Sequence, residues 1–178
     1  MHIDGGSRGN PGPAAFAVVV ESAEGAPLDA FSASLGETTN NVAEYEALLA
    51  ALRYAQSHHH SRIKVISDSE LLVRQVQGRY KVKSADLKPL FEQVQEMAGK
   101  LEAFSIEHVR REQNRDADRL VNKTLDAAEA RDTARPARAS SALPIKSSAR
   151  YQGGVLKLAH PLPLAEGEEV DVEVHRKL

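Results

Sequence analysis

The sequence predicts an α/β domain with a mixed five-stranded sheet, in which three antiparallel strands precede two parallel ones and helices flank the sheet. Over residues 1–128, strand-like and helix-like patterns follow one another in the order β-β-β-α-β-α-α-β-α. The first three strands form a meander, whereas the later strands follow helices, and such crossovers favour parallel neighbours. The composition changes after residue 130, and the strand-like patterns that return over residues 150–178 predict a small C-terminal β appendage.

The N-terminal meander is predicted from turn residues and alternation. Met1–Asp4 reads as a short strand that ends at the aspartate, and the glycine- and proline-rich stretch Gly5–Pro13 predicts a turn. Ala14–Val20 and Leu28–Leu35 are the next two strands. The turn between them contains Gly25, so these two strands predict a hairpin.

The longest helix is predicted over Thr39–Ser57, where apolar residues recur at three- and four-residue spacing behind a cluster of capping side chains. Shorter patterns of the same kinds complete the domain. They are, in order, the strand Arg62–Ser67, the helices Asp68–Gln77 and Ser84–Gly99 (the latter capped by Ser84), the strand Phe104–Val109 and the helix Arg115–Ala130.

Composition excludes several classes of protein. The 178 residues contain no cysteine, which excludes disulfides and thiolate chemistry. No apolar run is long enough to cross a membrane and the N-terminus is polar, so we expect a cytoplasmic protein. The net charge of −2 predicts weak overall attraction to phosphate, and any nucleic-acid binding must therefore rest on local basic patches and metal ions.

Four carboxylates are candidates for chemistry. Asp4 precedes two glycines, Glu44 lies in the first turn of the longest helix beside its apolar stripe, Asp68 directly follows a buried strand, and Asp118 lies at the start of the last helix. Each alone has an ordinary structural explanation as a turn residue, a helix-dipole acid or a cap. Asp116 competes with Asp118, but the spacing from the preceding asparagine and the apolar residues that follow favour Asp118.

As a set, the four acids predict a metal site. Each is predicted at a strand end or a helix start, in an order that can converge at one sheet edge, where four carboxylates would repel one another. Hard divalent cations relieve that repulsion, and Mg²⁺ prefers oxygen ligands. Two such ions about 4 Å apart can activate a water and stabilise the leaving oxygen of a phosphodiester.

Four motifs carry a resemblance to a known family. DGGSRGNPGP, TTNNVAEYEALLAAL, ISDSELLVRQV and REQNRDADRL, in this order over about residues 1–128, resemble type 1 ribonuclease H in its compact archaeal-like and bacterial form. The resemblance implies the mixed five-stranded sheet and a metal-dependent cut of the RNA strand of RNA–DNA hybrids that leaves 3′-hydroxyl and 5′-phosphate ends. It also implies that two Mg²⁺ ions, with Mn²⁺ as an alternative, are bound by Asp4, Glu44, Asp68 and Asp118.

The resemblance further implies contacts to the hybrid. Amide side chains can reach minor-groove edges and 2′-hydroxyls, which distinguish RNA from DNA, although helix capping is the alternative role of Asn40 and Asn41. Arginines in the loop before the last helix suit phosphate contact or product release. The predicted substrate-binding residues are Arg8, Asn10, Thr39, Asn40, Asn41, Ser69, Arg110 and Arg111.

The chain departs from the family pattern at several points. Only three residues precede Asp4, so we expect the first strand to be short and its true start to lie upstream. Glu70 stands where the family often has glutamine, and the chain has no basic helical insertion, no histidine in the loop 109–113 and no N-terminal hybrid-binding domain. Weak substrate binding is expected. His58–His60, three adjacent side chains that point in different directions, predict a solvated loop.

The C-terminal region predicts two further parts. Residues 131–149, rich in Ala, Ser, Arg and Pro, predict a flexible linker after a catalytic domain over 1–130. Residues 150–178 loosely resemble the β module of AF2212-like antitoxins. Because about 30 residues cannot build a full core, this module should dock on the catalytic domain, pair with a second copy or bind a protein partner.

Among enzymes, a nuclease that cuts double-stranded RNA or a related exonuclease is the alternative, and two functions of other classes also fit the sequence. One is a catalytically weak or inactive module that binds hybrids or double-stranded RNA and is regulated by the β tail, although all four predicted ligand positions are filled. The other is a regulatory protein whose tail binds a toxin or itself.

Overall fold

The structure is a computed structural model of the chain, and it describes residues 1–134, 149–152 and 155–158. The chain divides into two units, Met1–Arg135 and Pro136–Leu178. Most of the predicted linker and of the predicted β module lies outside the described residues. In the second unit, β6 and β7 form an antiparallel pair.

The first unit contains the predicted five-stranded mixed sheet, in the strand order β3-β2-β1-β4-β5. The elements are β1 His2–Ser7, β2 Gly12–Glu21, β3 Pro27–Thr38, α1 Asn40–Ser57, β4 Arg62–Ser67, α2 Glu70–Val76, α3 Leu87–Ala98, β5 Ala103–His108, the 3-10 turn η1 Arg111–Gln113, α4 Arg115–Ala134, and, in the second unit, β6 Ala149–Gln152 and β7 Val155–Leu158. Strands β1, β2 and β3 pair antiparallel, whereas β4 is parallel to β1 and β5 is parallel to β4. The predicted fold class and element order of this unit are therefore confirmed.

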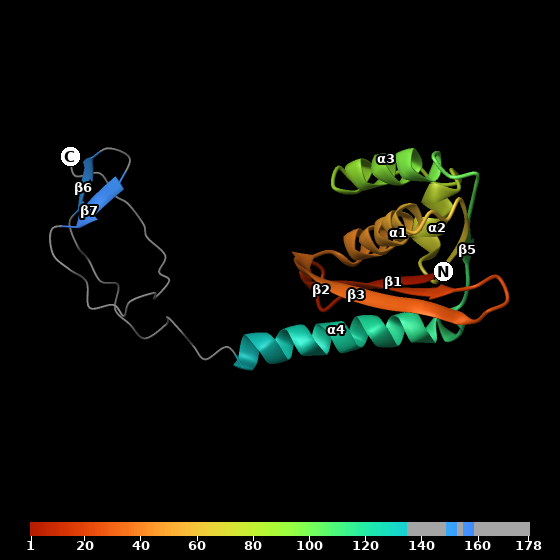
Figure 1. Cartoon of the computed structure of the whole chain (residues 1–178), viewed down its shortest axis with the longest axis horizontal. Helices are drawn as coiled ribbons and strands as arrows, with labels where there is room; N and C mark the ends of the chain where they lie inside the picture. The colour runs from red at the N-terminus through yellow and green to blue at the C-terminus, as the bar shows by residue number, and fades with distance from the viewer. Residues whose placement is uncertain (135–148, 153–154, 159–178) are drawn as a thin grey trace. The chain divides into compact units, whose positions relative to one another are not determined.

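The helices form layers on the two faces of the sheet. Helices α1 and α3 lie on one face and α4 lies along the other (Figure 1). The larger core lies under α1, where Ile3, Val18 and Leu48 are fully buried. A smaller core lies under α4, where Ala15 and Ala17 of β2 face Val121 and Leu125. Small side chains at these two β2 positions let α4 lie close to the sheet.

Strand β1 differs from the prediction. It does not end at Asp4 but continues through Gly5 and Gly6 to Ser7, and its residues pair in register with β2 from Val19 to Ala14. Asp4 consequently lies in the middle of a strand and not, as was predicted, at its end, and the strand is longer on its C-terminal side than expected. The turn predicted over Gly5–Pro13 is confined to the residues between β1 and β2.

The two glycines of β1 are required by tertiary packing. A Cβ at Gly5 would lie 2.2 Å from the backbone carbonyl carbon of Ala43 in α1, and a Cβ at Gly6 would lie 2.9 Å from Cγ1 of Val121 in α4. Successive strand residues face opposite sides of a sheet. Gly5 therefore admits α1 on one face, and Gly6 admits α4 on the other.

The remaining boundaries follow the prediction within a few residues. Thr39 caps α1 as predicted, with its Oγ1 accepting a hydrogen bond from the N–H of Val42. Helix α3 begins at Leu87 after the N-cap Asp86, so Ser84 is not the cap that was predicted. The backbone carbonyl of Ser84 instead accepts a hydrogen bond from the N–H of Lys88 at the turn before the helix. Helix α4 extends to Ala134, four residues past its predicted end.

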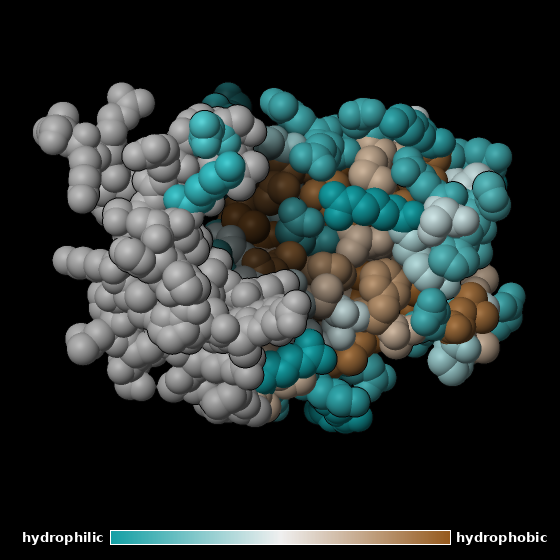
Figure 2. All heavy atoms as spheres, turned by 60° about the vertical axis from the view of Figure 1, so that its left-hand side comes forward, coloured by the Kyte–Doolittle hydropathy of each residue, from teal (hydrophilic) through white to brown (hydrophobic). Residues whose placement is uncertain are grey.

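The surface of the described domain is mixed in character. Hydrophobic side chains gather toward the middle of the face shown in Figure 2, and hydrophilic ones lie along its margin. Within the described residues, no helix combines the length and the apolar character needed to cross a membrane. His58–His60 are exposed as predicted. The rings of His58 and His60 do not diverge, however, because both stack near Tyr54, with centroids 3.9 and 6.2 Å from its ring.

Candidate active site

Asp4 and Glu44 form the buried half of the candidate site. Asp4 is 7% exposed at the centre of β1 and Glu44 is 6% exposed in the first turns of α1. The absent side chain at Gly5 allows the backbone of α1 at Ala43 and Glu44 to touch β1. Glu44 was expected to lie beside the apolar stripe of its helix, but it is buried among the core residues instead, because this helix end packs directly on the strand.

Asp68 and Asp118 complete the set from two other elements. Asp68 directly follows β4, where Oδ1 accepts a 2.8 Å hydrogen bond from Nδ2 of Asn114. Asp118 lies in the first turn of α4, and its carboxylate pairs with the guanidinium of Arg111. The competing acid, Asp116, is exposed on the same turn and contacts only Arg119 among the ion pairs of the described chain.

The four predicted carboxylates line one hollow of about 350 Å³. Gly5, Gly6 and Ser7 of β1 form part of its wall, and Arg8, Asn40 and Arg111 lie at it as well. Sequence positions 4, 44, 68 and 118 are thus brought together by the sheet order, because β1 lies between β2 and β4 while α1 and α4 pack on its two faces.

The electrostatics of this hollow are those of a crowded acidic site. Burial, together with the nearby charges of Asp68 and Asp118, raises the pKa of Asp4 to about 7. Burial also raises the pKa of Glu44 well above its ordinary value, with additional contributions from Asp4 and Asp68. Both acids are therefore poorly stabilised as anions by the protein alone.

A divalent cation fits this environment. Glu44 Oε2 is buried and has no hydrogen-bond partner within the described part of the chain, and an ion with oxygen ligands would satisfy such an atom. In the described residues, no three acidic or histidine side chains already enclose an ion position. Asp118 is turned to Arg111 and Asp68 to Asn114, so a bound ion would compete with these partners.

Two of the predicted substrate-binding residues, Asn10 and Asn40, tie the region around the β1–β2 turn to α1. Asn10 Oδ1 accepts from the N–H of Asn40, and Asn40 Oδ1 accepts from the N–H of Ser7, both at 3.3 Å. Thr39 caps the helix beside them. Asn41 is exposed on the first turn. Asn10, Thr39 and Asn40 therefore have structural roles as well as a position beside the acids.

The remaining predicted substrate-binding residues lie in different surroundings. Arg8 lies at the acidic hollow and pairs with Asp126 and Glu129 of α4. Ser69 caps α2 by accepting from the N–H of Leu72. Arg111 lines the acidic hollow, whereas Arg110 lines a second hollow.

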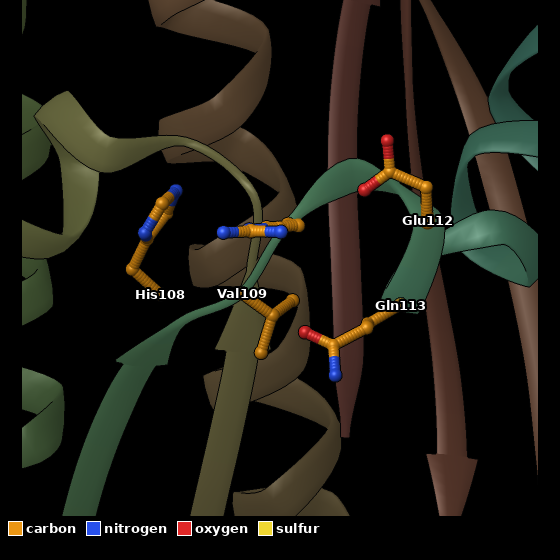
Figure 3. A pocket seen from close by; sticks show the side chains of 5 residues that line it. His108, Val109, Glu112 and Gln113 are labelled. Atoms are coloured by element: carbon orange, nitrogen blue, oxygen red, sulfur yellow. The ribbon is translucent and has the colours of Figure 1, made fainter.

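The second hollow lies beside the β5–α4 connection. Its volume is about 640 Å³, and His108, Val109, Glu112 and Gln113 surround it with Arg110 (Figure 3). It is larger than the acidic hollow, yet Glu112 is its only carboxylate. Because it lacks a carboxylate cluster, we place the candidate chemistry in the smaller hollow.

Two residues at the site were not predicted from the sequence. Asn114 is 1% exposed and contacts both β1 and Asp68. Asn122 lines the acidic hollow and donates from Nδ2 to the carbonyl of Asp118. Asn114 precedes a helix four residues before a predicted ligand, and this position was the one signal in the sequence that pointed to it.

The fold and the acidic hollow define an α/β domain with a candidate divalent-cation site. A family model described as reverse transcriptase-like matches residues 2–124, so the chain belongs to the reverse transcriptase-like family. A second family model, AF2212-like, matches residues 147–178.

Ribonuclease HI of Halobacterium salinarum is among the chain's relatives, with 39% identity over 127 residues, which is 71% of this chain and 64% of that protein. The bifunctional protein Rv2228c of Mycobacterium tuberculosis is 44% identical over 129 residues, which is 72% of this chain and 35% of that protein. The chain therefore spans about a third of the length of that relative.

Solved ribonuclease H structures share the fold. That of ribonuclease H1 from the archaeon Halobacterium salinarum has a TM-score of 0.69 and 38% identity, covering 71% of this chain and 96% of that one. LC11 ribonuclease H1, isolated from compost and solved in complex with an RNA/DNA hybrid, has a TM-score of 0.69 and 44% identity, covering 72% and 96%. The domain is thus close to ribonuclease H1 proteins, a family that implies divalent-metal dependence.

Proposed function

We propose that this chain is an endoribonuclease that hydrolyses the RNA strand of RNA–DNA hybrids and leaves 3′-hydroxyl and 5′-phosphate ends. The observation that carries the proposal is the hollow lined by Asp4, Glu44, Asp68 and Asp118. Its location in a domain similar to LC11 ribonuclease H1, which was solved in complex with an RNA/DNA hybrid, supports the choice of substrate.

In this proposal, the four carboxylates hold two Mg²⁺ ions, with Mn²⁺ as a substitute. When bound, the ions supply Lewis acidity to activate water and positive charge to stabilise the leaving oxygen. Asp4 and Glu44 are placed deepest, where few water molecules can compete as ligands. The Oε2 of Glu44, which has no hydrogen-bond partner among the described residues, is available to a cation. Asp68 and Asp118 are less buried and can adjust between their present partners and an ion.

Substrate binding in this proposal uses the residues at the rim of the hollow. Asn10, Asn40 and the exposed Asn41 present amides beside the acids, suited to 2′-hydroxyls and minor-groove edges. Arg111 lies at the carboxylates and is placed to contact a phosphate once Asp118 binds an ion. We further propose that the AF2212-like segment 147–178 mediates self-association or binding to a protein partner.

A cutting assay with a matched pair of variants tests the function. Full-length protein, Asp118→Asn and Asp116→Asn are incubated with labelled RNA–DNA hybrid in Mg²⁺ or in EDTA, with double-stranded RNA and DNA as controls. Because the two acids share one helix turn but only Asp118 lines the hollow, Asp118→Asn should cut more slowly by on the order of a hundredfold. Asp116→Asn should cut like wild type.

The outcomes separate the enzyme from a binding module. Hybrid-specific cutting that is lost in EDTA and in Asp118→Asn supports the proposal. A folded wild-type protein that binds the hybrid but cuts nothing in Mg²⁺ or Mn²⁺ would favour the inactive binding module. Equal loss in both variants would place Asp118 outside the metal site.

A further inference from the structure

We propose that Asn114 is the positioning residue of the acidic site, and that it fixes Asp68 relative to Asp4 and Asp118 so that the carboxylates can share cations. The inference deepens the proposed function and rests on it. Asn114 is almost fully buried, directly before α4, and touches three of the elements that carry the acids. It lies outside the set of predicted ligands and substrate contacts.

The side-chain amide of Asn114 joins β1 to the end of β4. Its Nδ2 donates to the backbone carbonyl of Ile3, the neighbour of Asp4, and to Oδ1 of Asp68, both at 2.8 Å. The carbonyl oxygen of Ile3 and the carboxylate oxygen of Asp68 are the acceptors of these bonds, which fixes the amide orientation with its nitrogen toward the site. Its Oδ1 then accepts from Nδ1 of His2 at 3.3 Å.

This contact occurs where the central strands separate. Strands β1 and β4 pair at one position, His2 with Ile66. Beyond it, the carbonyl of Ile3 is bonded by the amide of Asn114, which also holds Asp68 just past the end of β4. The asparagine therefore bridges the two strands at the point where their separation makes room for the acidic hollow.

The backbone of Asn114 connects the same point to the fourth acid. Its carbonyl accepts from the N–H of Asp118 at 3.1 Å, and its N–H donates to the carbonyl of Arg111 at 3.0 Å. One residue thus sets the start of α4, the turn that carries Arg111 and the orientation of Asp68. Removing its side chain would leave the Ile3 carbonyl and the Asp68 carboxylate without this donor.

The expected consequence is a loss of metal affinity. Outer partners of metal ligands typically contribute 10- to 100-fold to affinity because they hold the ligands in place. In Asn114→Ala, we expect Mn²⁺ to bind the full-length protein about tenfold more weakly or worse. The Mg²⁺ concentration for half-maximal hybrid cutting should rise in parallel, and cutting should partly recover at saturating Mg²⁺.

Gln75→Ala supplies the matched control. Gln75 is also a buried amide, 5% exposed, and its Oε1 accepts a 2.8 Å hydrogen bond from the hydroxyl of Tyr45. Both variants lose a buried amide and should unfold more easily, but Gln75 contacts none of the four acids in the described structure. Calorimetric titration with Mn²⁺ alone, together with thermal unfolding of each variant, separates lost positioning from lost stability.

The outcomes of these measurements test the positioning role of Asn114. Weaker Mn²⁺ binding in Asn114→Ala but not in Gln75→Ala supports the role. Wild-type affinity in Asn114→Ala, or equal weakening in both variants, would overturn it while leaving the proposed function intact. A wild-type protein that neither binds Mn²⁺ nor cuts hybrid would overturn both. If Asn114→Ala does not fold, Asn114→Ser, whose shorter side chain cannot bridge both acceptors, takes its place under the same criteria.

Discussion

Burial of the Asp4 carboxyl lowers the stability of the metal-free fold at high pH, but it places a potential cation ligand at the site. Its carboxyl lies in the middle of a strand, almost inaccessible to water and beside two other acids. Neutral carboxylic acid is favoured there, and a pKa of about 7 follows. Between pH 3.8, the ordinary pKa, and about pH 7, the carboxyl of Asp4 keeps its proton in the folded protein but loses it in the unfolded chain. Stability without metal should therefore fall as the pH rises through that window.

Asp4→Asn is expected to stabilise the metal-free protein at pH 8 while abolishing cutting. The amide carries no charge, so the variant should gain on the order of 2–3 kcal/mol over wild type at pH 8 in EDTA. Urea unfolding at pH 8 and at pH 4 measures the gain, which should shrink at the lower pH, where Asp4 is protonated in the folded wild type. A variant no more stable than wild type at pH 8 would contradict the electrostatic account.

Residue identities at the site were largely predictable, but burial was not. The four acids and Asn40 follow from ordered motifs and do line one hollow. The depth of Glu44 depends on how closely α1 approaches β1, which the helix pattern alone does not record. Asn114 was missed for the same reason, since its partners are 46 and 111 residues away in the chain.

At the scale of elements, β1 shows why a local turn signal can mislead. Two glycines after an aspartate usually mark a turn, yet here they pair with β2 in an unbroken ladder. Their small size serves the contacts with α1 and α4. By contrast, β4 and the helices matched the prediction closely, because apolar periodicity is a property of the element itself.

Gly5→Ala should be far more disruptive than Gly6→Ala. The new methyl at Gly5 would meet the backbone of α1, which cannot rotate away, whereas at Gly6 it would meet the tip of the Val121 side chain. We expect Gly6→Ala to cost about 1–3 kcal/mol of unfolding free energy and Gly5→Ala more than that.

Chemical denaturation of the two variants measures this order. The double variant Gly6→Ala/Val121→Ala is the control, because removing the Val121 tip should restore part of the loss from Gly6→Ala. Equal destabilisation by the two glycine variants would mean that α1 can shift away from β1 without penalty.

At the scale of the whole molecule, the described features that build the candidate site all belong to the first unit. All five strands of the sheet, both described hydrophobic cores and the acidic hollow lie within Met1–Arg135. The net charge of −2 leaves little general attraction to nucleic acid. Binding should therefore depend on local contacts in this unit and on metal ions.

Deleting residues 136–178 should leave the first unit folded, with the proposed cutting activity unchanged. The thermal midpoint and the rate of hybrid cutting should match those of the full chain, because no core residue of the described unit is removed. Solution mass measured alongside would show whether the AF2212-like segment drives self-association. A clear fall in the thermal midpoint on deletion would instead indicate that the tail contributes to the stability of the unit.

The paired glycines of β1 also bear on protein design. At Gly5 and Gly6 the middle layer of this three-layer sandwich is reduced to bare main chain, so α1 and α4 each approach the strand closely beside Asp4. Copying four acids onto another α/β scaffold would reproduce the composition of the hollow but not its spacing. A designer transplanting the site would first have to place glycine at two consecutive positions of the host strand, and only then choose the ligands.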